Sequence, residues 1–167
     1  MGPVAGTAGL RRRATWQAAG AAMLVALLGG LATDLGPWYA SLRQPPWKPP
    51  DAWFGPGWTV IYALAAWSCL EACLHAPRGR ARRRIVVMFA VNGALNVAWS
   101  VLFFRAQRPD WAMFEVVFLW SSILLLVAVV WRHSRLAAWL LLPYLAWVAF
   151  AATLNFAVVQ LNGPFGS

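Results

Sequence analysis

The chain has 167 residues, of which 61% are hydrophobic and 11% are charged, and it contains twelve tryptophans. A water-soluble domain of this length has too little interior to bury so much apolar surface, so the composition excludes an ordinary soluble enzyme domain. The net charge of +9 is typical of nucleic-acid binding, but the basic residues lie at the ends of apolar segments, where membrane topology explains them. We therefore expect an integral membrane protein that does not bind nucleic acid.

Long apolar segments without charges follow one another along the chain: Ala14–Thr33, Ala52–Leu70, Ile85–Phe104, Val116–Trp131 and Leu136–Ser167. About 20 helical residues cross the roughly 30 Å hydrocarbon layer of a bilayer. Unbroken apolar runs exclude the alternating strands of a barrel. The sequence predicts an all-α integral membrane protein, a bundle of five transmembrane helices forming a single domain over 1–167. The expected helices are about 15–36, 55–75, 85–105, 111–131 and 136–160.

The fourth apolar run reaches the required length only if its helix starts near Trp111. Glu115 then lies close to the start of that helix. A carboxylate at this position is stabilised by the helix dipole, and we expect it near the lipid headgroups.

Cations are distributed unequally between the two ends of the predicted bundle. Ten arginines flank one end: Arg11, Arg12, Arg13, Arg78, Arg80, Arg82, Arg83, Arg84, Arg132 and Arg135. Four cations flank the other: Arg43, Lys48, Arg105 and Arg108. Because cytoplasmic loops carry the excess of Lys and Arg, we expect a cytoplasmic N-terminus and an outside C-terminus. We expect the membrane to be that of a bacterial cell.

The third predicted helix carries polar and aromatic side chains on one face. Asn92, Asn96, Trp99 and Phe103 recur at spacings of four, three and four. Amides inside a membrane need partners, and they serve either as hydrogen bonds between helices or as the polar wall of a ligand cavity. These two interpretations are compatible. A separate stripe of alanines, at 90, 94 and 98, suits close helix contact within the bundle or across a dimer.

The fifth predicted helix repeats this pattern. Tyr144, Trp147, Ala151 and Asn155 share one face and offer a phenol, an indole, a gap and an amide. Pro143 lacks a backbone donor and is expected to kink the helix. A helix facing only lipid would have no use for this arrangement.

Residues that could carry hydrolytic or metal chemistry are sparse. Cys69 and Cys73 lie on one face of the second helix and are expected to be packing residues, whereas His75 and His133 lie at helix ends without further ligands. No nucleophile is paired with a base, so we expect binding rather than hydrolysis, with no metal and no required cofactor.

Three collinear stretches identify a relationship. They are "WYASLRQPPWKPP" followed by "GPGWTVIY", then "LNVAWSVLFF", and finally "PYLAWVAFAATLNF". Together they resemble the TspO/translocator protein family, whose members are also called tryptophan-rich sensory proteins or peripheral-type benzodiazepine receptors. The resemblance covers about Trp38 to Asn162.

The resemblance implies a five-helix bundle, commonly a homodimer, that binds porphyrins, isoquinoline- and benzodiazepine-type drugs and, in animal members, cholesterol. It implies a ligand pocket between the helices, with loop 37–54 as its lid. The implied pocket residues are Trp38, Phe54, Trp58, Tyr62, Asn96, Trp99, Trp111, Trp147, Ala151 and Asn155. Prolines in the loop lower the entropy lost on holding it closed, and its indoles offer stacking surfaces.

Some positions depart from the family pattern. Asn92 replaces a usual glutamine, and Trp53 stands one place beyond a usual tryptophan. The animal sterol motif requires a tyrosine and then a basic residue, where this chain has Phe156 and Gln160. Sterol binding is therefore the least supported of the implied properties.

We accordingly expect a membrane receptor, sensor or translocator that binds porphyrins, such as protoporphyrin or haem, in an aromatic pocket, with amides, Arg43 or Lys48 meeting the propionates. The alternative is an enzyme that degrades porphyrins with light and oxygen, using Trp58 and Trp147 as electron or radical partners. A further alternative is a protein that binds sterols or lipids, or a membrane scaffold with an incidental cavity.

Overall fold

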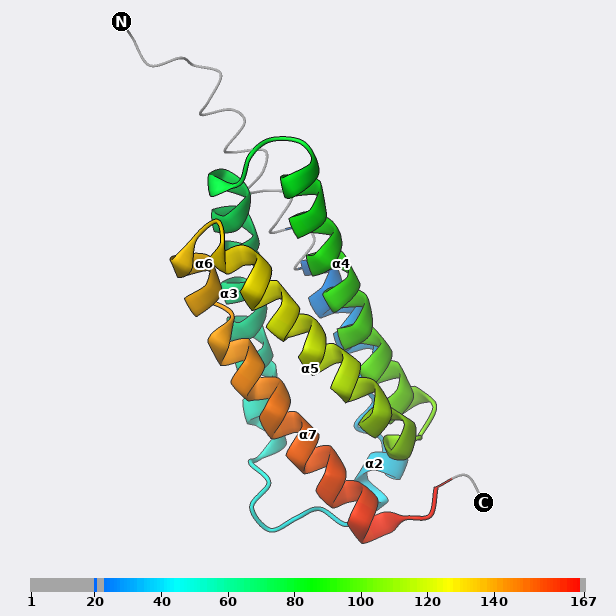
Figure 1. Ribbon diagram of the computed structural model, residues 1–167. Coiled ribbons are helices and arrows are strands. Elements are labelled where there is room, and N and C mark those ends of the chain that lie inside the picture. Colours follow the sequence, from blue (N-terminus) through cyan, green and yellow to red (C-terminus); the bar gives the residue numbers. More distant parts are fainter. Residues whose placement is uncertain (1–19, 21–22, 166–167) are drawn as a thin grey trace, which may run out of the picture.

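The computed structural model describes residue 20 and residues 23–165, and the regular structure in this part of the chain is entirely helical (Figure 1). An N-terminal helix is described over Met23–Ala32. The labelled helices are α2 (Pro37–Ser41), α3 (Phe54–His75), α4 (Arg80–Ser100), α5 (Pro109–Trp131), α6 (Arg135–Trp139) and α7 (Leu142–Asn162). A 3-10 turn, Asp51–Trp53, precedes α3, and a π-helical turn, Val101–Arg105, extends α4.

Among the described residues, four helical segments are long and apolar enough to cross a membrane: Asp51–His75, Arg80–Arg105, Pro109–Trp131 and Arg135–Asn162. The N-terminal helix adds a shorter apolar segment. The predicted all-helical bundle of about five spans is confirmed.

The first predicted helix, 15–36, is only partly covered, because most of the residues before Met23 lie outside the described part of the chain. Its described portion ends at Ala32, earlier than predicted. The Asp34 carboxylate accepts the Gly36 amide (2.9 Å), and Pro37 then starts α2. An aspartate turn followed by a proline is incompatible with continuing the helix.

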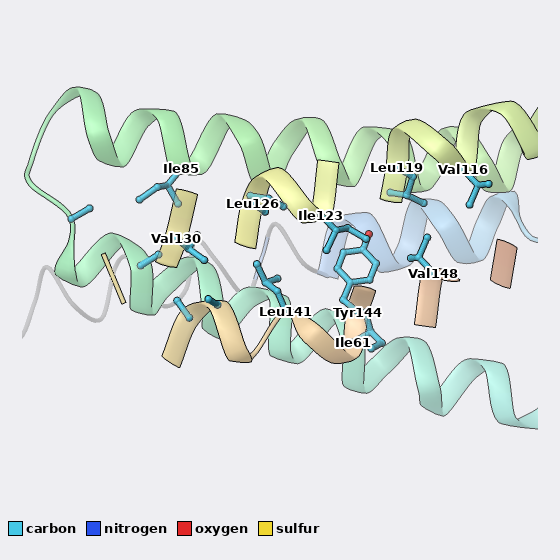
Figure 2. Close-up of a cluster of buried hydrophobic side chains, with 14 residues drawn as sticks. Ile61, Ile85, Val116, Leu119, Ile123, Leu126, Val130, Leu141, Tyr144 and Val148 are labelled. Carbon is cyan, nitrogen blue, oxygen red and sulfur yellow. The ribbon is translucent and has the colours of Figure 1, made fainter. Parts of the chain in front are cut away.

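Helix α5 packs between α4 and α7 (Figure 1). Its buried residues form a single stripe with spacings of four and three: Ala112, Val116, Leu119, Ile123, Leu126 and Val130. Figure 2 shows Ile123 and Leu126 of this stripe pointing toward Leu141 and Tyr144. The opposite face exposes large apolar side chains such as Phe114 and Phe118, as expected for contact with lipid.

The last span is divided into two helices, where the sequence predicted one helix over 136–160 with a kink at Pro143. The regular α-helix is interrupted at Leu140 and Leu141, which keep right-handed helical backbone angles, and Pro143 lies in the first turn of α7. Proline has no N–H to donate to the carbonyl of Trp139, so the break precedes the proline by one turn. The short α6 packs on α3, where the Ser68 hydroxyl donates to the Ala137 carbonyl (2.7 Å).

A hydrogen bond between side chains sets the register of α4 against α5. The Asn92 amide donates to the Ser122 hydroxyl (2.8 Å), and this hydroxyl donates to the Leu119 carbonyl (2.6 Å). Asn92 therefore serves as an interhelical contact. The alanine stripe on α4 lies outward at Ala90 and Ala94, and the homodimer stays a prediction.

Candidate functional site

A cavity of about 570 Å³ opens between the N-terminal helix, α3, the end of α4 and α7, beneath the loop that follows α2. Aromatic rings make most of its wall: Tyr39, Phe54, Trp58, Tyr62, Trp99, Phe103, Phe104 and Trp147. Such a concave, mainly apolar space with a few polar groups is typical of small-molecule sites.

One aromatic wall is built from α3 and α7. The Trp58 ring stacks on Tyr62, with centroids 5.4 Å apart and planes at 22°, and it meets Trp147 edge to face at 6.1 Å. Phe54 also meets Trp147 edge to face, at 6.0 Å. The rings hold one another in fixed orientations, so this wall is preorganised for stacking.

The opposite wall comes from the end of α4. Trp99 stacks on Phe103, with centroids 5.2 Å apart and planes at 28°, and Phe104 meets Trp99 edge to face. The π-helical turn begins immediately after Ser100, and the Ala106 amide bonds to the Val101 carbonyl (2.9 Å). An extra residue in this turn rotates the following side chains, and both Phe103 and Phe104 line the cavity.

Small residues leave the space that the rings enclose. Gly29 and Gly30 of the N-terminal helix and Ala151 of α7 line the cavity. Gly57 serves a different purpose, because a Cβ there would lie 2.4 Å from the Trp147 ring. Only glycine allows the indole to lie this close to α3.

Behind the α3 wall, a polar network joins three helices. The Tyr62 hydroxyl donates to the Asn96 side-chain oxygen (2.6 Å), and the Asn96 amide donates to the Tyr144 hydroxyl (3.3 Å). Asn96 therefore joins α3, α4 and α7, and it is not among the residues that line the cavity. The interhelical hydrogen bonds expected for this amide are present.

The cavity mouth carries a small charged cluster. Tyr39 donates to Asp51 (2.9 Å), and the Lys48 ammonium lies 2.5 Å from the same carboxylate and 5.5 Å from the Tyr39 ring centroid. Burial raises the pKa of the Tyr39 phenol well above its usual value, and the hydrogen bond to Asp51 raises this pKa further. The phenol therefore remains a donor at neutral pH.

The loop over the cavity is attached at its far side to the end of α7. The Asn162 side chain accepts the Arg43 amide (2.7 Å) and donates to the Arg43 carbonyl (2.9 Å). The Asn162 side chain therefore satisfies both the N–H and the carbonyl of the Arg43 backbone. The loop is thus fixed to α7 by Asn162, whereas Tyr39 and Asp51 connect its two ends.

Seven of the ten predicted pocket residues line the cavity: Phe54, Trp58, Tyr62, Trp99, Trp147, Ala151 and Asn155. In the amide orientation that satisfies both groups, Asn155 donates to the Pro109 carbonyl (3.2 Å) and accepts the Met113 amide (3.1 Å). This residue thereby joins α7 to the first turn of α5.

The other three predicted residues lie elsewhere. Asn96 is in the network behind the wall, and Trp38 packs edge to face on Phe103 at 6.2 Å. Trp111 is 52% exposed on α5, and the Arg108 guanidinium lies 4.3 Å from its ring centroid. The buried stripe of α5 passes through the next residue, Ala112, which directs Trp111 away from the cavity.

Sequence reasoning missed several lining residues. Gly29 and Gly30 were not assigned to the pocket, although a glycine pair inside an apolar helix is a signal for close approach. Gln44 and Asp51 depend on the path of the loop, for which the sequence has no periodic signal. Within the described residues, no group of three or more His, Cys, Asp or Glu side chains is placed to hold a metal ion.

The contact between Gly57 and Trp147 provides a test of the wall. Gly57→Ala should lower the free energy of unfolding by about 1–3 kcal/mol, because the new methyl group displaces a packed indole. Gly55→Ala is the matched control on the same helix, since a Cβ there meets nothing within 4 Å. Thermal unfolding in detergent measures both variants, and equal midpoints would contradict the close packing.

Comparison with known proteins gives a consistent relationship. The TspO/MBR family model matches residues 18–161. The chain is 39% identical over 157 residues to the translocator protein of Sus scrofa, covering 88% of this chain and 91% of that protein. It is 37% identical over 125 residues to the tryptophan-rich protein TspO of Chlorobaculum tepidum, covering 75% and 79%. It is 31% identical over 128 residues to a tryptophan-rich sensory protein of Cereibacter sphaeroides, covering 75% and 77%. With its helical bundle and its apolar spans, the chain belongs to the TspO/MBR family of integral membrane proteins.

Proposed function

We propose that this membrane protein is a sensor or translocator that binds porphyrins in the cavity of about 570 Å³. Relatives named translocator protein and tryptophan-rich sensory protein support the general class. The observation that carries the specific proposal is the pair of aromatic walls. A porphyrin is a flat macrocycle with two broad apolar faces, which suits stacking on indole and phenyl rings.

The edges of the macrocycle need a different environment from its faces. Porphyrin propionates are anionic and are best placed at the cavity mouth, close to the charged loop. Lys48 is paired with Asp51, so a propionate would compete with this carboxylate for the ammonium.

Replacing either central indole should weaken binding without unfolding the bundle. Trp58→Ala and Trp147→Ala each remove one stacking face, and aromatic stacking on a nucleobase contributes roughly 1–3 kcal/mol, so we expect a loss of about tenfold or more in protoporphyrin affinity. Fluorescence-quenching titration measures it. Trp139 is 60% exposed and does not line the cavity, so Trp139→Ala is the control and should bind as wild type does. Equal affinities for all four proteins would place the ligand elsewhere.

A second candidate function is porphyrin degradation driven by light and oxygen. The observation favouring it is the contact between Trp58 and Trp147, two oxidisable indoles whose centroids lie 6.1 Å apart on the cavity wall. If this function is correct, illumination in air should convert bound protoporphyrin into a new absorbing species. Trp147→Phe should then retain most of the affinity but slow the conversion. Bleaching at the same rate in both proteins would exclude the indole from the reaction.

We also propose that the end of the bundle with the most arginines faces the cytoplasm of a bacterial cell. The turn between α3 and α4 and the turn before α6 lie at one end, and the loop after α2 lies at the other (Figure 1). In a background without Cys69 and Cys73, Arg78→Cys should not react with a membrane-impermeant thiol reagent in intact cells, whereas Pro46→Cys should. The reverse labelling pattern would overturn the orientation.

A further inference from the structure

The end of the bundle that contains the α3–α4 turn and the turn before α6 carries arginines that the protein does not neutralise (Figure 1). Within the described part of the chain, no salt bridge involves the exposed arginines of this end, which are Arg78, Arg80, Arg83, Arg84, Arg132 and Arg135. At the opposite end, by contrast, Lys48, Arg105 and Arg108 each pair with an aspartate. Positive charge is therefore uncompensated at one end only.

The chain has too few acidic residues to change this balance, since it contains five in all. Three of them pair with the cations at the opposite end: Asp34, Asp51 and Asp110. Glu115 lies in the second turn of α5, and its carboxyl oxygens are enclosed by protein rather than placed near the headgroups as the sequence suggested. Glu71 accepts the Ser134 hydroxyl (3.3 Å) and lies 3.3 Å from His75 Nδ1. The anion that balances the exposed arginines must therefore come from outside the chain.

At one corner of this end, two of the arginines lie beside exposed indoles. Trp131 ends α5 and meets Trp139 at the end of α6, with ring centroids 6.4 Å apart. The Arg135 guanidinium lies 5.9 Å from the Trp131 ring centroid, within the range of a cation–π contact. Arg132 follows Trp131 directly. One apolar span ends and the next begins here, which is the level at which tryptophans typically meet lipid headgroups.

This corner, formed by Trp131, Arg132, Arg135 and Trp139, has the same two-part character as a phospholipid. The phosphate of a phospholipid is anionic, and guanidinium groups match its geometry with paired N–H donors. The upper part of the acyl chains is apolar and packs on exposed indole rings. A free phosphate would use the arginines but not the indoles, so the apolar half of the corner favours a lipid.

We propose that this corner binds the headgroup of an anionic phospholipid, with Arg132 and Arg135 meeting the phosphate and Trp131 and Trp139 contacting the acyl chains. A zwitterionic headgroup fits less well, because its own cation is repelled by the uncompensated arginines nearby. The remaining arginines of this end add a general attraction for anionic lipid. None of the corner residues lines the cavity, so the inference does not depend on porphyrin binding.

Native mass spectrometry of the detergent-solubilised full chain tests the site, because it resolves bound lipids and gives their relative affinities. We expect wild type to bind dioleoyl phosphatidylglycerol roughly tenfold more tightly than dioleoyl phosphatidylcholine, which has the same acyl chains. Arg132→Gln combined with Arg135→Gln should abolish most of this preference. Arg83→Gln combined with Arg84→Gln is the matched control, since it removes the same charge from the same end, and it should keep most of the preference. All four side chains are exposed, so neither double variant should unfold.

Three results would overturn the proposal. Equal affinities of wild type for the two lipids would show that the corner does not select anionic headgroups. Equal losses in the two double variants would show a diffuse attraction in place of a site. Displacement of phosphatidylglycerol by an equal concentration of soluble glycerol phosphate would show that the arginines bind free phosphate and that the indoles contribute nothing.

Discussion

The hydrogen bonds of Asn96 determine where the packed part of this bundle ends and the cavity begins. The Asn96 side chain accepts a hydrogen bond from the Tyr62 hydroxyl of α3 and donates one to the Tyr144 hydroxyl of α7. These two bonds join α3, α4 and α7 at a single level. In a membrane no water competes for these groups, and separating the helices would leave all three without partners. Tyr62 also lines the cavity, so the same network supports its wall.

The interior of the bundle is filled at one end and contains the cavity at the other. Toward α6, the interior is filled by aliphatic side chains such as Ile85, Leu126, Val130 and Leu141, all of them fully buried. Toward α2, the interior is walled by aromatic rings that surround space. Rigid rings in edge-to-face contact can surround an opening that flexible aliphatic side chains would fill, which is why the walls of the cavity are aromatic.

The loop over the cavity is held by polar contacts at defined points and is otherwise held by packing. Asn162 binds the backbone of Arg43, and Tyr39 binds Asp51. Trp38 and Leu42 pack on the small cluster formed by Phe103, Ala112 and Val158. Because prolines restrict the unfolded loop, few contacts are sufficient to order it.

The sequence by itself determined the spans and the chemistry of their faces. Apolar runs of sufficient length can satisfy their backbone groups in lipid only as helices, so the bundle follows from composition and length. The spacing of three and four placed Tyr144, Trp147, Ala151 and Asn155 on one face of α7. Of these, Trp147, Ala151 and Asn155 line the cavity, whereas the Tyr144 hydroxyl bonds to Asn96 in the network behind the wall. The break before Pro143 was predicted as a kink, because the missing donor is evident but the direction of the chain after it is not.

Only the tertiary structure decided which aromatic residues face the cavity. Trp111 and Phe103 are equally apolar in sequence, yet the first is 52% exposed on α5 and the second is buried beside the cavity. In water, the polar face of a helix reveals its buried face. In lipid both faces are apolar, so α5 has no sequence signal that separates the stripe through Ala112 from the side that carries Phe114. Which face of α5 is buried depends on how closely the side chains of neighbouring helices fit together and on a few buried hydrogen bonds, such as the one between Asn92 and Ser122.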